Sequence, residues 1–267
     1  MSVERRKFLK LAGLTALGVA GGVTRGVLAE QSVAEDTSLV PTPGADTPSG
    51  PLTAKRWAMV IDVKKCREQA DCNDCQLACH VTHNVPDFGN PKDEIKWIWK
   101  ESFEHAFHDQ ENAHLPEELK HTRMPVLCNH CDNPPCVRVC PTQATWKREE
   151  DGIVMMDWHR CIGCRYCVAA CPYGSRSFNW RDPRSHIKEI KADFPTRTRG
   201  VVEKCTFCEE RLVRGRLPAC VTSCKHSALV FGDLEDPLSD VRKLLAERFS
   251  IRRRVGLGTQ PEVYYVL

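Results

Sequence analysis

The sequence predicts an α+β fold in which short strands and short helices repeat around four groups of cysteines. All sixteen cysteines of the 267-residue chain fall into four groups of four. A short apolar or β-branched run precedes each group and a similar run follows three of them, at 57–61, 124–127, 153–156 and 201–202, and at 144–146, 178–180 and 228–231. Such short runs beside turn residues are typical of strands.

The cysteines are the candidate metal ligands of the chain. In chain order the four groups are Cys66, Cys72, Cys75 and Cys79; Cys128, Cys131, Cys136 and Cys140; Cys161, Cys164, Cys167 and Cys171; and Cys205, Cys208, Cys220 and Cys224. The third group reads C-x2-C-x2-C-x3-C-P, the run with which bacterial ferredoxins bind clusters, and its fourth cysteine serves a different cluster from the first three. We therefore expect four [4Fe–4S] clusters in two interleaved ferredoxin-like modules.

Three of the groups depart from this spacing. The second has two extra residues before its third cysteine, at Pro134 and Pro135, and the fourth has an eleven-residue spacer, 209–219, expected to form one or two helical turns. In the first group five residues separate Cys66 from Cys72. This gap leaves open whether Cys66 is a ligand, and a three-iron cluster is the alternative for its site.

Zinc is the other metal that fits this pattern, because C-x2-C pairs also form tetrahedral structural sites. Zinc sites do not require the third group's run, so iron is favoured. Disulfide-stapled proteins are usually shorter and spread their cysteines over loops. The chain contains no C-x2-C-H haem motif, dinucleotide fingerprint or nucleophile elbow. We expect an electron carrier without its own catalytic residues or small-molecule substrate.

The N-terminal residues 1–29 are expected to be an export signal. Arg5 and Arg6 precede Phe-Leu-Lys and a weakly apolar run, and Val-Leu-Ala at 27–29 follows as the expected cleavage site. This arrangement resembles a twin-arginine signal, which implies export of a folded protein to the periplasm; a Sec signal or a membrane anchor is the alternative. Residues 30–54 are rich in proline, glycine and small polar residues and are expected to form a flexible linker.

The charge distribution argues against nucleic acid as a partner. The net charge is +3, but residues 1–29 contribute five basic residues and one acidic residue. The rest of the chain is therefore at −1, without the global basic excess of a nucleic-acid-binding protein. Residues 160–225 carry 14 lysines and arginines against 6 acidic residues. We expect these cations to offset the negative charge of clusters and thiolates.

The four-cluster domain is expected to span 55–233, with an acidic and aromatic insertion at 81–123. Within the insertion, 94–100 has the alternation of a strand, and Phe103 and Phe107 have helical spacing. These aromatics are expected to pack in the core. Residues 234–267 are expected to form a helix capped by Asp236, with Pro237 at its first position, and an extended tail. The apolar face of this helix should comprise Leu238, Val241, Leu244 and Leu245.

Over residues 55–267 the four groups resemble the iron–sulfur subunits of molybdopterin-oxidoreductase complexes. The segments 79–86, 95–100 and 103–107, with the export signal, resemble more specifically the DsrO family, periplasmic iron–sulfur subunits of the membrane complex associated with dissimilatory sulfite reductase. The resemblance implies that the first and fourth groups exchange their fourth cysteines, as do the second and third. The implied sites are Cys66, Cys72, Cys75 with Cys224; Cys205, Cys208, Cys220 with Cys79; Cys128, Cys131, Cys136 with Cys171; and Cys161, Cys164, Cys167 with Cys140.

The same resemblance implies the partners. They would be a polytopic quinone-interacting membrane subunit, a haem c subunit and further subunits of a membrane complex. The function expected from it is the relay of electrons between a quinone-linked subunit and other redox partners in sulfur metabolism. Two alternatives stay open: a subunit of another periplasmic reductase, for tetrathionate, polysulfide or nitrite, and a zinc-structured interaction module.

Overall fold

A computed structural model describes residues 50–69 and 71–267, so the expected export signal and most of the expected linker lie outside the described residues. The strands are β1 (Trp57–Asp62), β2 (Ile98–Ser102), β3 (Arg123–Leu127), β4 (Thr145–Lys147), β5 (Val154–Met156), β6 (Ser177–Phe178), β7 (Val202–Glu203), β8 (Leu229–Asp233), β9 (Ser250–Ile251) and β10 (Val263–Val266). The α-helices are α2 (Val63–Arg67), α3 (Asp74–Thr82), α4 (Phe103–Ala106), α5 (Glu117–Lys120), α6 (Pro135–Arg138), α7 (Tyr166–Ala170), α8 (Glu209–Leu212), α9 (Ala219–Thr222) and α10 (Asp240–Glu247). In this part of the chain no helix has both the length and the apolar character needed to cross a membrane.

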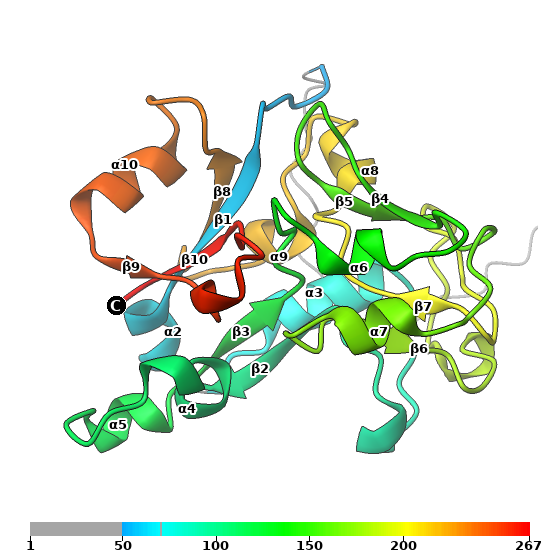
Figure 1. The fold of residues 1–267 in the computed structure, drawn as a ribbon, viewed down its shortest axis with the longest axis horizontal. Coiled ribbons are helices and arrows are strands. Elements are labelled where there is room, and N and C mark those ends of the chain that lie inside the picture. The colour runs from blue at the N-terminus through cyan, green and yellow to red at the C-terminus, as the bar shows by residue number, and fades with distance from the viewer. Residues whose placement is uncertain (1–49, 70) are drawn as a thin grey trace, which may run out of the picture. The chain divides into compact units, whose positions relative to one another are not determined.

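A four-stranded sheet, in the order β8-β1-β10-β9, brings together the beginning and the end of the described chain. Strand β1 pairs antiparallel with β8 and parallel with β10, so that Met59 lies between Phe231 and Val263. The three strands lie side by side in Figure 1. Because β1 leads into the first cysteine group and β8 follows the fourth, the sheet places these two groups next to each other.

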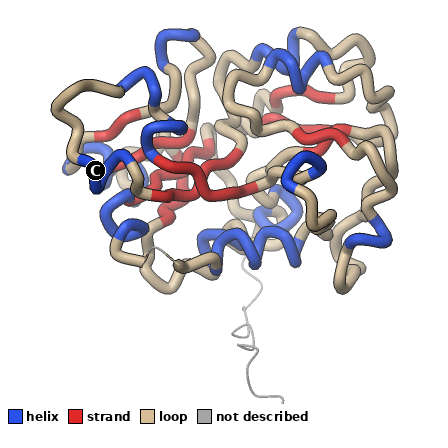
Figure 2. Tube along the Cα trace, turned by 90° about the horizontal axis from the view of Figure 1, so that it is seen from below, coloured by secondary structure: helices blue, strands red, loops and turns tan. Residues whose placement is uncertain are grey.

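The remaining strands form three antiparallel pairs, β2–β3, β4–β5 and β6–β7. Each apolar run expected beside a cysteine group overlaps a strand: β1, β3, β5 and β7 before the groups, and β4, β6 and β8 after them. Figure 2 shows the strands in the middle of the described unit, with the short helices around them. This mixture is the α+β arrangement that the sequence predicts.

The aromatic residues of the insertion are core residues, as expected. Trp97, Phe103 and Phe107 are 1%, 2% and 0% exposed. The Phe107 ring meets the Tyr265 ring of β10 edge to face, with centroids 4.9 Å apart. Strand β2 begins at Ile98 and not at the expected Glu94, because the Lys96 N–H donates to the side chain of Ser177 and not to a neighbouring strand. The insertion therefore anchors itself against the sheet.

The expected start of the C-terminal helix is wrong. Helix α10 begins at Asp240, and its N-cap is Ser239, whose hydroxyl oxygen accepts the Arg242 N–H. Asp236 instead accepts the Leu238 N–H in a local turn, a competing use of an aspartate side chain before a helix. Leu238 consequently stays 78% exposed, whereas Val241 is buried against β1. Helix α10 thus covers one face of the sheet with a shorter apolar stripe than expected.

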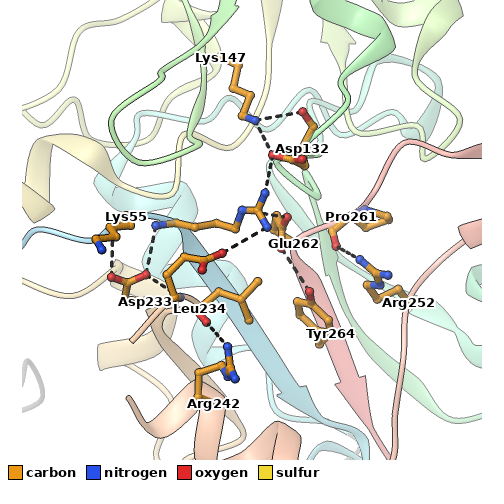
Figure 3. A network of polar contacts seen from close by, with 12 residues as sticks. Lys55, Asp132, Lys147, Asp233, Leu234, Arg242, Arg252, Pro261, Glu262 and Tyr264 are labelled. Carbon is orange, nitrogen blue, oxygen red and sulfur yellow. Dashed lines mark hydrogen bonds and ion pairs between the residues drawn. The ribbon is translucent and has the colours of Figure 1, made fainter. Parts of the chain in front are cut away.

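A polar network around Arg56 ties the sheet to the second cysteine group (Figure 3). The Arg56 guanidinium lies 2.9 Å from Asp132 and 3.6 Å from Glu262. Asp132 also accepts from Lys147 at the end of β4. Asp132 directly follows Cys131, so the network fixes the cysteine loop to strands at both ends of the described chain.

Within this network Glu262 is buried at 4% exposure. Burial raises the pKa of its carboxyl from 4.5 to about 7, although Arg56 opposes the shift. Between these two values the folded chain binds more protons than the unfolded chain, so stability falls as the pH rises through this window. At 1.36 kcal/mol per pKa unit, the free energy of unfolding decreases by at most roughly 3 kcal/mol across this window.

The variant Glu262→Gln should therefore lack this loss of stability. Its unfolding midpoint, followed by circular dichroism at about pH 4.5 and about pH 7.5, is expected to exceed that of the unchanged protein by more at the higher pH. Equal pH dependence in the two proteins would contradict the assignment of the carboxyl.

Candidate metal centres

Cysteines of different groups lie close together in the structure, and four sites are named here by the cysteines assigned to them. Site A is Cys66, Cys72, Cys75 and Cys224; site B is Cys205, Cys208, Cys220 and Cys79; site C is Cys128, Cys131, Cys136 and Cys171; site D is Cys161, Cys164, Cys167 and Cys140. All sixteen lie in the described part of the chain and none is in a disulfide bond. Sites A, B and C each bring together three cysteines of one group and the fourth cysteine of another, and the composition of site D is the one that the family resemblance implies.

The four cysteines of site A line one cavity, beside helix α2 and the start of β8. Burial, followed by the charges of Cys75 and Cys224, raises the pKa of the Cys66 thiol to about 12. Around the five-residue gap the Gln69 N–H donates to the Cys66 carbonyl and the Cys72 N–H donates to the Gln69 carbonyl, which makes a turn of the chain. The turn brings the chain back, so the irregular spacing does not remove Cys66 from the site.

Site B is the most enclosed of the four, because each of its cysteines is buried. The pKa of the Cys79 thiol is raised by burial and then by the charges of the three other cysteines of the site. Two backbone N–H groups point at its sulfurs: Phe207 donates to Cys205 and Ala219 donates to Cys208, each at 3.4 Å. Helix α8, within the expected spacer 209–219, carries the chain from Cys208 toward Cys220.

Site C brings Cys171 of the third group into a cavity lined by three cysteines of the second. The pKa of the Cys131 thiol is raised by burial and by the charges of its neighbours Cys128, Cys136 and Cys171. Pro134 and Pro135 line the same cavity, where the two-residue insertion turns into helix α6. Cys171 therefore lies with the second group in space, although it belongs to the third in sequence.

Site D lies where α6 packs on α7. Cys140 and Cys161 are partly buried and contact the same apolar cluster as Cys167. The loop between Cys161 and Cys167 passes through two residues with left-handed backbone, Gly163 at φ +69° and Arg165 at φ +65°. Site D is more exposed than site B, since only Cys167 among its cysteines is buried.

The sites follow one another in the order A, B, C, D. Thiols of successive sites lie near enough to raise one another's pKa beyond the effect of burial: Cys75 acts on Cys220, Cys128 on Cys205 and Cys136 on Cys167. The two ends of this order are partly open to solvent, since three cysteines in site A and three in site D are partly exposed. Sites B and C between them are largely enclosed.

These sites fit iron–sulfur clusters on structural grounds. Sites A, B and C each bring four cysteine sulfurs together, and none of the sixteen cysteines is in a disulfide bond. Negatively charged thiolates that lie close together in a buried site repel one another, and the raised pKa values of Cys66 and Cys75 reflect this repulsion together with burial. Positively charged iron bound between the thiolates would offset it. Backbone N–H groups also donate hydrogen bonds to the cysteine sulfurs, as the Ala228 N–H does to Cys224 at 3.3 Å. Such hydrogen bonds are typical of the sulfurs around iron–sulfur clusters.

Among the buried residues beside the cysteines are two histidines, His130 and His83. His130 is 1% exposed and accepts the Val154 N–H, and burial lowers its pKa well below the usual value. The ring of His83 lies 3.6 Å from the Cys79 sulfur and 3.1 Å from the Glu210 carboxylate. The sequence feature that could have identified His83 is its position one helical turn after Cys79.

Two buried cations near site C were also not identified from the sequence. Arg176 is 4% exposed and Lys204 is 0% exposed. Lys204 donates to the carbonyl oxygens of Val154 and Cys205. Both belong to the basic stretch 160–225, so the expected neutralising charge includes residues inside the protein and is not confined to its surface.

Comparison with known proteins defines the class. Residues 119–191 and 160–228 each match a 4Fe-4S dicluster domain family. The chain is 40% identical to Hdr-like menaquinol oxidoreductase iron-sulfur subunit 1 of Archaeoglobus fulgidus, over 98% of this chain and 97% of the relative. It is 38% identical to the iron-sulfur cluster-binding subunit of menaquinone reductase from Nitratidesulfovibrio vulgaris, over 79% and 88% of the two chains. It is 34% identical to a tetrathionate reductase subunit of Salmonella typhimurium, over 100% and 89%.

The chain is thus a protein of ferredoxin-like dicluster domains that binds several 4Fe–4S clusters. It belongs to the family of iron–sulfur electron-transfer subunits of molybdopterin-oxidoreductase-type, membrane-associated reductase complexes. This membership favours iron over zinc at the cysteine sites.

Proposed function

We propose that this chain carries single electrons through four [4Fe–4S] clusters held in sites A, B, C and D, in that order. The observation that carries the proposal is the arrangement of the sixteen cysteines: neighbouring sites interact in pairs, and only the first and last sites have most of their cysteines partly exposed. Electrons would enter at one end and leave at the other. The enclosed middle clusters would be protected from solvent and from side reactions.

In this proposal the two modules interleave. The outer module holds sites A and B, which exchange Cys79 and Cys224, and the inner module holds sites C and D, which exchange Cys140 and Cys171. Pairing of β1 with β8 supports the outer exchange, because it sets the first and fourth groups side by side. The chain would act without a substrate site of its own.

The exposed apolar residues around site D suit contact with a redox partner. Ile162, Tyr166 and Trp180 are 67%, 62% and 53% exposed. The guanidinium carbon of Arg165 lies 4.7 Å from the centroid of the Trp180 ring. This cation–π contact helps to hold the exposed side chains in place. Aromatic and arginine side chains are enriched at protein interfaces. We assign this surface to a partner that exchanges electrons with site D.

The partners would be a polytopic quinone-interacting membrane subunit, a haem c subunit and other subunits of a membrane complex. Relatives that are named as subunits of a menaquinol oxidoreductase and of a menaquinone reductase support the quinone-linked partner. We propose residues 1–29 as a twin-arginine signal that exports the protein to the periplasm, and sulfur metabolism of the sulfite reductase type as its setting. The full-length match to a tetrathionate reductase subunit keeps that reductase class as the second candidate.

Redox titration followed by electron paramagnetic resonance, with iron and sulfide analysis, tests the relay. The expected result is four reducible clusters and about sixteen irons per chain. A colourless protein that holds only zinc would end the proposal. A site A signal typical of a three-iron cluster would show that Cys66 is not a ligand.

Purification of the tagged chain from native membranes tests which membrane complex the chain belongs to. Recovery with a quinone-linked membrane subunit and a haem c subunit is the expected outcome. Recovery with a molybdenum catalytic subunit would show that the chain belongs to a tetrathionate-type reductase and not to a sulfite reductase-associated complex. The proposed electron relay would be unaffected.

A further inference from the structure

The guanidinium of Arg176 lies at the junction between site C and site D. It is 4% exposed. Its Nη2 donates to the Cys136 sulfur of site C at 3.1 Å and to the Thr145 hydroxyl at 2.8 Å. Its Nη1 lies 3.6 Å from the Met156 sulfur. These contacts, with the cavity of site C on one side, fix the position of the charge.

The electrostatic surroundings of this guanidinium are two sets of cysteines. It interacts with Cys136 and Cys128 of site C and with Cys167 of site D, and these charges keep its pKa raised although burial opposes this. In residues 50–69 and 71–267 no carboxylate forms an ion pair with it. The buried Arg197, by contrast, pairs with the carboxylate of Glu203.

A buried charge without a carboxylate partner is costly unless other groups offset it. An arginine stays protonated in proteins, so Arg176 cannot lower this cost by losing its proton. The negative charge that surrounds it is that of the cysteine thiolates and the groups they bind. The geometry therefore couples the stability of this cation to the charge held in sites C and D.

We propose that Arg176 is a positioning residue for electron transfer, whose fixed positive charge raises the reduction potentials of the clusters in sites C and D. The inference rests on the proposed function, because it takes cysteine-bound clusters in these sites as given. Net charge and hydrogen bonds to the sulfurs are among the factors that set cluster potentials. Each reduction adds one electron beside the guanidinium and each oxidation removes it, with no proton gained or lost by Arg176.

The test compares Arg176→Met with Arg176→Lys in the full chain with its clusters. Potentials are measured by redox titration with paramagnetic resonance detection, and signals are assigned with Cys136→Ser and Cys161→Ser. In Arg176→Met the potentials of the clusters in sites C and D are expected to fall, while that of site A is unchanged. Arg176→Lys keeps the charge, so it should return both potentials most of the way to their original values.

A matched control is Arg160→Met, which removes a solvent-exposed arginine that pairs with Asp157 near site D. Because exposed charges are screened by water, this variant should leave all four potentials unchanged. Equal potentials in Arg176→Met and the unchanged protein, with all four clusters present, would overturn the role of Arg176 and leave the relay standing. Fewer than four clusters in the unchanged protein would instead overturn the proposed function.

A second measurement needs no substitution and covers the case in which neutral variants fail to fold. Protein labelled with ¹⁵N-arginine should show ¹⁵N hyperfine coupling on the reduced cluster of site C, through the N–H bonded to the Cys136 sulfur. The coupling should be absent from the cluster of site A. If no cluster shows the coupling, the proposed contact between Arg176 and site C is wrong.

Discussion

Replacing Cys171 by serine is expected to remove a cluster from site C and to leave site D occupied. In sequence Cys171 closes the third group, but in the structure it lines the cavity of the second group's Cys128, Cys131 and Cys136. Without its fourth thiolate the buried cluster would be lost or reduced to three irons, because site C is enclosed and offers little room for a solvent ligand. Iron analysis should show a loss of one to about four irons per chain.

Double variants distinguish this assignment of cysteine ligands from the alternative in which each sequence group binds its own cluster. Cys171→Ser with Cys128→Ser removes two ligands of one site, so the loss should stay near four irons. Cys171→Ser with Cys161→Ser removes ligands of two sites, and the loss should approach eight irons. The opposite ordering of the two double variants would refute the exchange of cysteines between groups.

Much of the fold follows from local pattern. The apolar runs beside the cysteine groups form strands because each is short, β-branched or aromatic, and bounded by residues that favour turns. Phe103 begins helix α4 and Phe107 directly follows its last residue, and both rings are buried. Such features depend on neighbours within a few residues, which a sequence displays directly.

Features that depend on distant residues were harder to predict. Strand β10 lies between β1 and β9 in the sheet, where Tyr265 is 0% exposed, and the tail pattern alone does not choose that place. The N-cap of α10 is Ser239 and not Asp236, because the Asp236 side chain accepts the Leu238 N–H in a local turn before the helix. Which groups exchange their fourth cysteines came from family resemblance, since the spacing does not say which group receives each one.

The same reasoning explains why the cations near the clusters were predicted only as a group. The basic excess in 160–225 is visible in the sequence, but the separation of exposed charges from buried ones is not. Arg176 and Arg184 look alike in sequence, yet Arg176 touches a cysteine sulfur and Arg184 pairs with Asp182 at the surface. Burial at a junction of two sites is set by the fold, and it changes the effect of the charge by removing the screening by water.

Gly163→Ala is expected to disrupt site D, whereas Gly174→Ala should be tolerated. Both glycines have left-handed backbone, at φ +69° and +66°, so an alanine costs about 1 kcal/mol of conformational strain at either position. Only at Gly163 would the new Cβ also lie 2.3 Å from the carbonyl oxygen of Gly200 and 3.0 Å from the Phe178 ring. Since the nearer obstacle is backbone, the cysteine loop itself must move.

The expected result for Gly163→Ala is a loss of about four irons, the disappearance of the site D signal, and an unfolding midpoint several degrees below that of Gly174→Ala. Clusters in sites A, B and C should keep their signals, because the loop 161–167 supplies ligands to site D alone. Iron analysis, paramagnetic resonance and thermal unfolding of the two variants side by side measure this. Full iron content in Gly163→Ala, with the midpoint of Gly174→Ala, would mean that the close approach of the site D loop to Gly200 does not constrain the cluster.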